Sequence, residues 1–327
     1  MSHATRAIPN PAFTGTDPSA EAGQTAVGAL IETTKPGITR LVSITALVGL
    51  LMGAMAGVEL SPGRLIFLAT VCTIGTALAS GGANALNMWL ETSRDARMRR
   101  TAGRPLPSGR LRTGHVAWFG AVATLLGVLV LALGTGGPAP ALVALACAGI
   151  YVLVYTPLKP VTAWNTIVGT IPGALPPLIG TAAVSGEPGL GALGEPVGWA
   201  LFALMTVWQL PHFYAIAWLH REDYERGGFR MLSRNDASGA RSAWAILSLS
   251  ILLIPAMLAP AWVAPDLLGL PYVAIVCVTG VGFVVLCARF FARRDRARAR
   301  GVFIASIMHL PLVLIAMVAE AAWRTLA

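Results

Sequence analysis

Nine apolar stretches, each about 20 residues long, limit what this chain can fold into. Because an α-helix rises about 1.5 Å per residue, a stretch of about 20 apolar residues crosses the hydrocarbon layer of a membrane. Hydrophobic residues make up 55% of the chain and charged residues only 12%, a balance that excludes nearly every class of soluble protein. We therefore expect an all-α polytopic membrane protein whose spans cover residues 38–57, 65–90, 114–134, 139–156, 163–184, 197–219, 242–263, 270–291 and 301–322.

The basic residues lie mostly on one side of these expected spans. The N-terminal segment and the loops after the second, fourth, sixth and eighth spans, with the adjoining helix ends, hold 22 of the 24 Lys and Arg residues. Because cytoplasmic loops are enriched in Lys and Arg, this distribution places the N-terminus in the cytoplasm or the mitochondrial matrix. We expect the bacterial cell (inner) membrane, with the mitochondrial inner membrane as the alternative. The net charge of +9 follows from the same asymmetry, so we expect no nucleic-acid partner.

The N-terminal segment differs in composition from the rest of the chain. It is rich in Ser, Thr, Ala, Gly and Pro and lacks an apolar core, which predicts a disordered cytoplasmic tail at residues 1–27. Residues 28–327 are expected to form one membrane domain of nine helices. The cysteines fall inside expected spans without the spacing of metal ligands, which predicts buried thiols at Cys72, Cys147, Cys277 and Cys287.

Three oxygen-bearing side chains follow one another at the end of the second apolar stretch. Asn87, Glu91 and Asp95 are spaced four residues apart, so a helix places them on one stripe that drifts by only about 40° per step. The preceding residues from 65 to 90 carry no charge, so the stripe is expected where a transmembrane helix leaves the hydrocarbon. Hard oxygen ligands at such a place suit Mg²⁺ bound to a diphosphate. An ordinary solvated helix end is the alternative.

Two further features favour an anionic ligand at this side of the membrane. Seven arginines and only two acids lie between residues 91 and 112, more cations than orientation requires. A bound polyanion, with Mg²⁺ between it and the carboxylates, would balance the excess positive charge of these arginines. A second acidic cluster, Glu222, Asp223 and Glu225, follows the sixth expected span and so lies on the same side. The two clusters together predict a clamp for one or more Mg²⁺ ions and a diphosphate.

Several motifs resemble those of the membrane-embedded, UbiA-type prenyltransferases, and specifically the protohaem IX farnesyltransferases. The first is the string from Asn84 to Leu111, which contains RPLPSG at residues 104–109. The resemblance covers about residues 30 to 320. Further matches are TKPG at 34–37, YT at 155–156, LK at 158–159, WNT at 164–166, PGA at 172–174, PPLIG at 176–180, PHF at 211–213 and EDY at 222–224.

The resemblance implies a UbiA-like helical bundle that transfers a farnesyl group from farnesyl diphosphate to a vinyl group of haem B. The implied products are haem O and diphosphate, the cofactor is Mg²⁺, and a downstream haem A synthase is an implied partner. Asn87, Glu91 and Asp95 would form the first metal and diphosphate motif, with Asp223 in the second. Of these, the implied metal ligands are Glu91, Asp95 and Asp223.

The chain departs from the family pattern at both motifs. Many members carry Asp where this chain has Glu91, and Leu219 and Gly227 flank Asp223 at four residues where a second acid would complete the motif. The number of Mg²⁺ ions therefore stays open. Glu222 is expected as a further substrate contact.

Other polar residues near the two clusters are expected to bind the substrates. Lys159, Arg104 and Arg100 are the expected diphosphate contacts, although each also fits the orientation signal alone. Asn165, at the start of the fifth span, would bond the diphosphate or a neighbouring helix. His212, inside the sixth span, would contact haem, ligate its iron or serve as a base for water, with a structural buried histidine as the alternative.

Three prolines at positions 172, 176 and 177 predict a break in the fifth span and a cavity wall suited to a flat ligand. Two other functions stay open. One is a related prenyltransferase that acts on a quinone precursor or a chlorin, which should lack the combination of RPLPSG and PHF. The other is a non-catalytic transporter of haem or lipid, since broken helices and buried polar groups also fit transport.

Overall fold

The computed structural model describes residues 25–327, and within them the chain is helical with no strand. Nine segments of this part are long and apolar enough to cross a membrane, which confirms the predicted fold class and the number of spans. They are α3 (Pro36–Met55), α4 (Pro62–Asp95), α5 (Thr113–Thr135), α6 with the π-helix η1 and α7 (Pro138–Leu158), α8 with α9 (Asn165–Val184), α10 (Pro196–Leu219), α12 (Ala240–Val263), α13 (Leu270–Ala292) and α14 (Arg296–Leu326).

Three short elements lie outside these spans: α2 (Ala26–Thr33), the 3₁₀-helix η2 (Gly189–Gly194) and α11 (Arg221–Arg226). Most of the tail expected at residues 1–27 lies outside the described residues. Its last residues are helical, because Thr25 caps α2 by accepting a hydrogen bond from the Gly28 amide at 3.1 Å.

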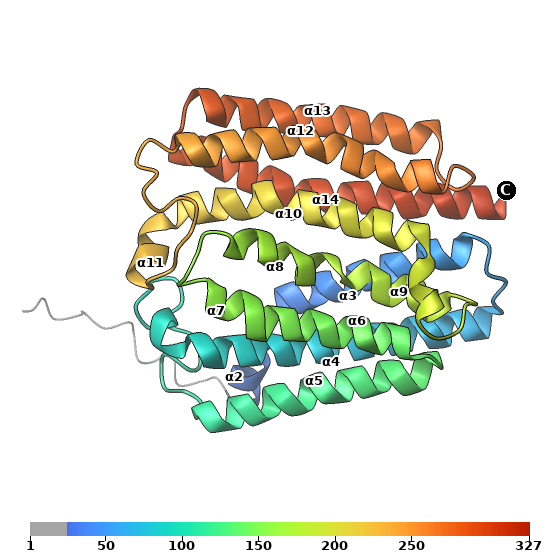
Figure 1. Cartoon of the computed structure of the whole chain (residues 1–327), viewed down its shortest axis with the longest axis horizontal. Helices are drawn as coiled ribbons and strands as arrows, with labels where there is room; N and C mark the ends of the chain where they lie inside the picture. Colours follow the sequence, from blue (N-terminus) through green and yellow to red (C-terminus); the bar gives the residue numbers. More distant parts are fainter. Residues whose placement is uncertain (1–24) are drawn as a thin grey trace, which may run out of the picture.

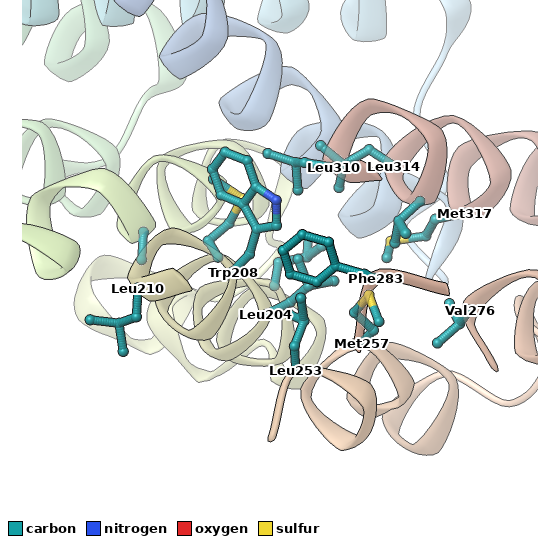
Figure 2. Close-up of a cluster of buried hydrophobic side chains, with 14 of the residues drawn as sticks. Leu204, Trp208, Leu210, Leu253, Met257, Val276, Phe283, Leu310, Leu314 and Met317 are labelled. Atoms are coloured by element: carbon teal, nitrogen blue, oxygen red, sulfur yellow. The ribbon is translucent and has the colours of Figure 1, made fainter. Parts of the chain in front are cut away.

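The helices form two groups (Figure 1), and these groups contact each other through α3 and α10. In the first, α10, α12, α13 and α14 enclose a large apolar core, where Trp208, Met257 and Phe283 meet (Figure 2). In the second, α3, α4, α5, α6 and α9 enclose a smaller core that includes Leu50, Leu68 and Leu131. Burial of these side chains leaves the outward apolar faces to the lipid.

Glycines bring helix backbones into direct contact within the second group. A Cβ atom on Gly180 of α9 would lie 1.9 Å from the Ala46 carbonyl oxygen of α3, and one on Gly49 of α3 would lie 2.1 Å from the Pro177 carbonyl oxygen. The same holds between α4 and α5, where a Cβ on Gly127 would lie 2.4 Å from the Ala79 amide nitrogen. Small residues allow such approaches inside membranes, where packing contacts hold helices together.

Two spans are interrupted in their backbone pattern. Pro172 lies inside α8 (Asn165–Ala174), and Pro176 starts α9 (Pro176–Val184), so the fifth span consists of two helices that meet at Leu175, as the prolines predicted. The fourth span changes from α6 (Pro138–Gly149) to the π-helix η1 (Ile150–Tyr155) before the short α7 (Thr156–Leu158). Irregular backbone at membrane depth occurs where it is buried in protein or lines a cavity.

The helix α4 is longer than the expected span of residues 65–90 and continues without a break to Asp95. This extension keeps Glu91 and Asp95 on the same helical face as Asn87. The end of α10 and the helix α11 lie at the same end of the bundle (Figure 1). The two acidic regions therefore lie at the same end of the bundle, as the span count predicted.

The contact between α3 and α9 generates a first prediction. Gly180→Ala should lower the free energy of unfolding by about 1–3 kcal/mol, because the new methyl group meets a backbone carbonyl that cannot move alone. Unfolding of the purified protein in mixed micelles measures the change. Gly282→Ala in α13 is the matched control, since a Cβ there meets nothing within 4 Å. Equal stability of both variants would contradict the close contact.

Candidate active site

The polar stripe of α4 is buried. Asn87, Glu91 and Asp95 are 0%, 4% and 1% exposed, although they lie at the end of a membrane span. The helix places all three on its inner face, as their spacing predicted. Buried polar groups need partners, so the contacts of this stripe determine what the site can bind.

Each side chain of the stripe meets a cation from a different segment. The Lys35 ammonium, between α2 and α3, donates to Asn87 Oδ1 at 2.5 Å. Lys159 Nζ, just after α7, lies 2.8 Å from Glu91 Oε1, and Arg104 Nη1, in the loop after α4, donates to Asp95 Oδ2 at 2.6 Å. Asn87 in turn donates to Thr156 Oγ1 at 2.8 Å. The stripe is thus an alternation of oxygen ligands and cations.

A second stripe, from η1 and the residue that follows α7, faces the first. Tyr151, Tyr155 and Lys159 are also four residues apart, and the two tyrosine rings stack with centroids 5.6 Å apart and planes inclined by 24°. The Tyr151 hydroxyl donates to Asn84 Oδ1 at 3.3 Å, and the Lys159 ammonium lies 4.6 Å from the Tyr155 ring centroid. These rings cover the site on one side and present π-electron density to it. Sequence reasoning missed Tyr151 and Tyr155 as site residues.

The spacing of this second stripe could have identified the two tyrosines from the sequence. It repeats the four-residue spacing of the acidic stripe and ends in Lys159, which was expected at the diphosphate. Sequence reasoning also left Lys35 without a role. Its backbone has the left-handed conformation, φ 49°, which is uncommon for a residue with a side chain and often marks a functional site. Burial and the neighbouring Arg104 and Lys159 cations lower the pKa of Lys35 to about 7. The sequence feature that could have identified Lys35 is a single cation directly before Pro36, where the first span starts.

The Lys159 ammonium is held differently. Burial is the largest single influence and disfavours its charge, but the Glu91 carboxylate and the Tyr155 and Tyr151 hydroxyls together outweigh burial and raise the pKa of Lys159 above its ordinary value. Lys159 is the ion-pair partner of Glu91 Oε1, and no other described residue donates a hydrogen bond to this oxygen. A buried carboxylate oxygen with spare capacity, next to Asp95, is the kind of donor a divalent cation requires.

Asp223 of α11 lies near the end of α4 but faces backbone amides. Its carboxylate accepts from the amides of Arg99 and Arg100 at 3.2 and 3.4 Å, and lies 3.3 Å from the Arg226 guanidinium. Within residues 25–327, no group of three or more His, Cys, Asp or Glu side chains is arranged as a metal site. The structure therefore brings the second acidic region beside the first without joining the carboxylates into one cluster.

The remaining expected contacts have different surroundings. The Arg100 guanidinium lies 5.9 Å from the Tyr224 ring centroid. Glu222 is exposed and lies 3.7 Å from Arg226. Asn165 is fully buried, and its amide donates to the carbonyls of Thr162 at 2.5 Å and Arg230 at 2.8 Å. In this arrangement Asn165 holds the segment after α11 against the start of α8.

An apolar cavity of about 620 Å³ opens beside the two stripes. Asn84, Tyr151 and Tyr155 line it next to the acidic stripe, and Thr76 lies two turns further along α4. Residues of both helix groups contribute, because α10 and α14 form the wall opposite α4 and α6. Its size is typical of pockets that enclose a substrate.

His212 belongs to this opposite wall. Its ring lies between the Trp208 and Phe303 rings, with centroid distances of 5.2 Å to each and interplanar angles of 16° and 25°. Its Nδ1 atom lies 2.8 Å from Ser306 Oγ. The sequence placed His212 inside a span near the second acidic cluster, and the structure places it on the cavity.

The model of the UbiA prenyltransferase family matches residues 42–310, so the chain belongs to this family. Among similar curated proteins, the protoheme IX farnesyltransferase of Solibacter usitatus (strain Ellin6076) is 39% identical over 293 residues, 86% of this chain and 95% of the relative. That of Opitutus terrae (strain DSM 11246 / JCM 15787 / PB90-1) is 41% identical over 296 residues, 89% of this chain and 93% of the relative.

Solved structures resemble the chain in fold. A UbiA homologue from Aeropyrum pernix K1 has a TM-score of 0.64 at 16% identity, covering 86% of this chain and 97% of that one. A UbiA homologue from Archaeoglobus fulgidus, bound to DMAPP and Mg²⁺, has a TM-score of 0.55 at 13% identity, covering 88% and 98%. These likenesses confirm the UbiA-like helical bundle.

The buried pair of Lys159 and Glu91 generates a second prediction. Lys159→Met should lower the free energy of unfolding by about 3 kcal/mol, because it leaves a buried carboxylate without a counter-charge. Adding Glu91→Gln should restore most of this loss. Unfolding of the single and double variants in mixed micelles measures both effects. Arg298→Met, which removes the partner of a half-exposed Asp295, is the control and should change stability little.

Proposed function

We propose that this protein transfers the farnesyl group of farnesyl diphosphate to a vinyl group of haem B, giving haem O and diphosphate. The observation that carries the proposal is the buried polar stripe of α4, with a cation at each member, at the edge of a large apolar cavity. The protoheme IX farnesyltransferases that resemble the chain over almost their whole length support the choice of donor and acceptor.

The costly step is cleavage of the allylic carbon–oxygen bond, which leaves negative charge on the departing diphosphate. Lys35, Lys159 and Arg104 already lie on the polar stripe and are suited to bind this anion. Arg100, at the adjoining helix end, is proposed as a further contact. Asn87 would orient the stripe through its bonds to Lys35 and Thr156. Glu222 and Asn165 remain candidate contacts at the edge of the site.

The cofactor proposed here is Mg²⁺, held by Glu91 and Asp95 with Asp223 from the neighbouring helix. The buried, incompletely bonded Glu91 carboxylate beside Asp95 supports this assignment, as does Mg²⁺ in the Archaeoglobus fulgidus homologue. When bound, the ion neutralises the charge that develops on the diphosphate. The carboxylates of this chain would fix its position at the end of α4.

The carbon chemistry takes place on the apolar side of the stripe. As the allylic bond breaks, the farnesyl carbon gains positive charge, and the vinyl group of haem attacks it to form a carbon–carbon bond. Water then adds to the resulting haem-side cation and releases one proton, which leaves a hydroxyethyl farnesyl group. The apolar cavity excludes water from the first step, and the rings of Tyr151 and Tyr155 lie where they can stabilise cationic carbon.

We place the protein in the bacterial inner membrane with its N-terminus in the cytoplasm. The bacterial relatives and the basic residues at one end of the bundle support this placement. The proposed site then opens toward the cytoplasm. Its product is the substrate for a haem A synthase, which we propose as the downstream partner.

The decisive test supplies membranes that contain the protein with haem B, farnesyl diphosphate and Mg²⁺. We expect haem O and diphosphate to form in equal amounts, as followed by chromatography with mass detection. Parallel reactions with a quinone precursor and with a chlorin test the related acceptors. Product from either of these but not from haem would overturn the proposed acceptor, and haem movement without any product would indicate a transporter.

The metal assignment generates a further prediction. Glu91→Gln and Asp95→Asn should each lower the transfer rate on the order of 100-fold or more, because each removes an anionic oxygen while keeping the shape of the side chain. Glu225→Gln, an exposed position on α11, should retain the rate of the parent protein. Full turnover in excess chelator would overturn the assignment of Mg²⁺.

The orientation generates a prediction of its own. In a background without the native cysteines, Ser108→Cys and Gly186→Cys should react with a membrane-impermeant thiol reagent from opposite sides, because an odd number of spans separates the two loops. Ser108 should react from the cytoplasmic side. Labelling of both positions from one side would contradict the span count.

A further inference from the structure

We infer that His212 binds the iron of the haem substrate through its Nε2 atom, and that Ser306 selects this nitrogen. The inference deepens the proposed function, on which it rests for the identity of the substrate. It assigns a specific role to each of two residues that face each other from α10 and α14. Ser306 touches no substrate in this account and acts as a positioning residue.

The first step concerns how firmly the ring is held. His212 lies between two aromatic rings, with Trp208 at 5.2 Å and Phe303 at 5.2 Å between centroids. The Trp208 indole is itself fixed, because its Nε1 donates to the Ser306 carbonyl oxygen at 3.0 Å. Two nearly parallel neighbours restrict rotation of the imidazole, so its nitrogens keep fixed directions.

The second step concerns which ring nitrogen carries the proton. Ser306 Oγ lies 2.7 Å from the Phe303 carbonyl oxygen, which can only accept, so the single hydroxyl proton is used there. In its 2.8 Å contact with His212 Nδ1, the same hydroxyl oxygen must therefore accept. The neutral imidazole then has its proton on Nδ1 and its free electron pair on Nε2. This arrangement, with the other ring nitrogen donating to a protein group, is the usual one for a metal-bound histidine.

The third step concerns where Nε2 lies. His212 lines the cavity, and its Nε2 atom makes no hydrogen bond to another described residue and is not fully buried. The other histidines within residues 25–327 do not line it. His309, on α14, has both ring nitrogens buried without partners and stacks on Phe283 at 5.4 Å. His212 is therefore the imidazole that a haem in this cavity can reach.

Other side chains on the cavity wall carry atoms that bind iron, but their surroundings are less suitable. The Cys147 sulfur lies 2.7 Å from the Pro172 carbonyl oxygen and is engaged there as a thiol. The hydroxyl of Tyr151 is shared between Asn84 and Lys35. The His212 Nε2 atom makes no such bond, so no bond has to break before this atom binds a metal.

The test uses the purified full-length protein in lipid nanodiscs, titrated with haem B without farnesyl diphosphate. We expect a ferrous spectrum of imidazole-ligated haem, with an iron–histidine stretching band in resonance Raman scattering. His212→Phe keeps a flat ring between Trp208 and Phe303 but removes the nitrogen, so it should abolish this band and weaken haem binding by at least about tenfold. His212→Gly should lose the band and regain it when free imidazole is added.

Ser306→Ala separates the positioning role from simple packing. Loss of the acceptor for Nδ1–H should make the imidazole a weaker donor and lower the iron–histidine stretching frequency, while the haem stays ligated by His212. His309→Phe is the matched control on the same helix and should leave both the frequency and the haem affinity unchanged. A frequency that is the same in Ser306→Ala and the parent protein would overturn the role of Ser306.

The outcomes also separate this inference from the proposed function. An unchanged spectrum and affinity in His212→Phe would overturn the ligand assignment, even in a protein that forms haem O. A band that depends on Cys147 or Tyr151, or the absence of haem binding, would overturn it as well. An imidazole spectrum that disappears in His212→Phe, in a protein that forms no haem O, would support the ligand and overturn the transferase.

Discussion

The need to neutralise carboxylates buried at the end of a membrane helix governs the whole site. Glu91 and Asp95 are almost fully enclosed, and leaving such a group unpaired costs several kcal/mol. Lys159 and Arg104 supply the counter-charges, and Lys35 completes the series at Asn87. Because these cations come from three segments far apart in sequence, the electrostatic requirement ties the start of α3, the end of the fourth span and the loop after α4 to one point.

Backbone hydrogen bonds near Lys159 also connect neighbouring segments to this site. The Arg230 amide donates to the Lys159 carbonyl oxygen at 2.7 Å, and Asn165 holds the Arg230 carbonyl oxygen, so the segment after α11 closes against the stripe. Different backbone features accompany the close helix contacts and the cavity. Glycines such as Gly180 let α3 and α9 touch, whereas proline and π-helical interruptions accompany the cavity on its other walls. A rigid contact on one side thus supports a cavity on the other.

The candidate site has two chemically different parts that suit the two substrates of the proposed reaction. The polar stripe beside the cavity, with its alternating oxygens and cations, suits a diphosphate and its metal ion. The wall formed by α10 and α14 offers flat rings and one imidazole, His212, which suit an iron macrocycle. In the proposed reaction the reacting carbons meet between these parts, where Tyr151 and Tyr155 form an aromatic boundary.

The sequence by itself determined the fold class, the number of spans and the helical face that carries Asn87, Glu91 and Asp95, because hydrophobic length and helical periodicity are local properties. Only the tertiary structure decided which cation meets which oxygen, since those contacts join residues far apart in sequence, such as Lys35 and Tyr151, which are 116 residues apart. The tautomer of His212 likewise depends on Ser306, 94 residues later. Spacing predicts which side chains share a face, whereas partners across a bundle follow from how helices pack, which no local pattern contains.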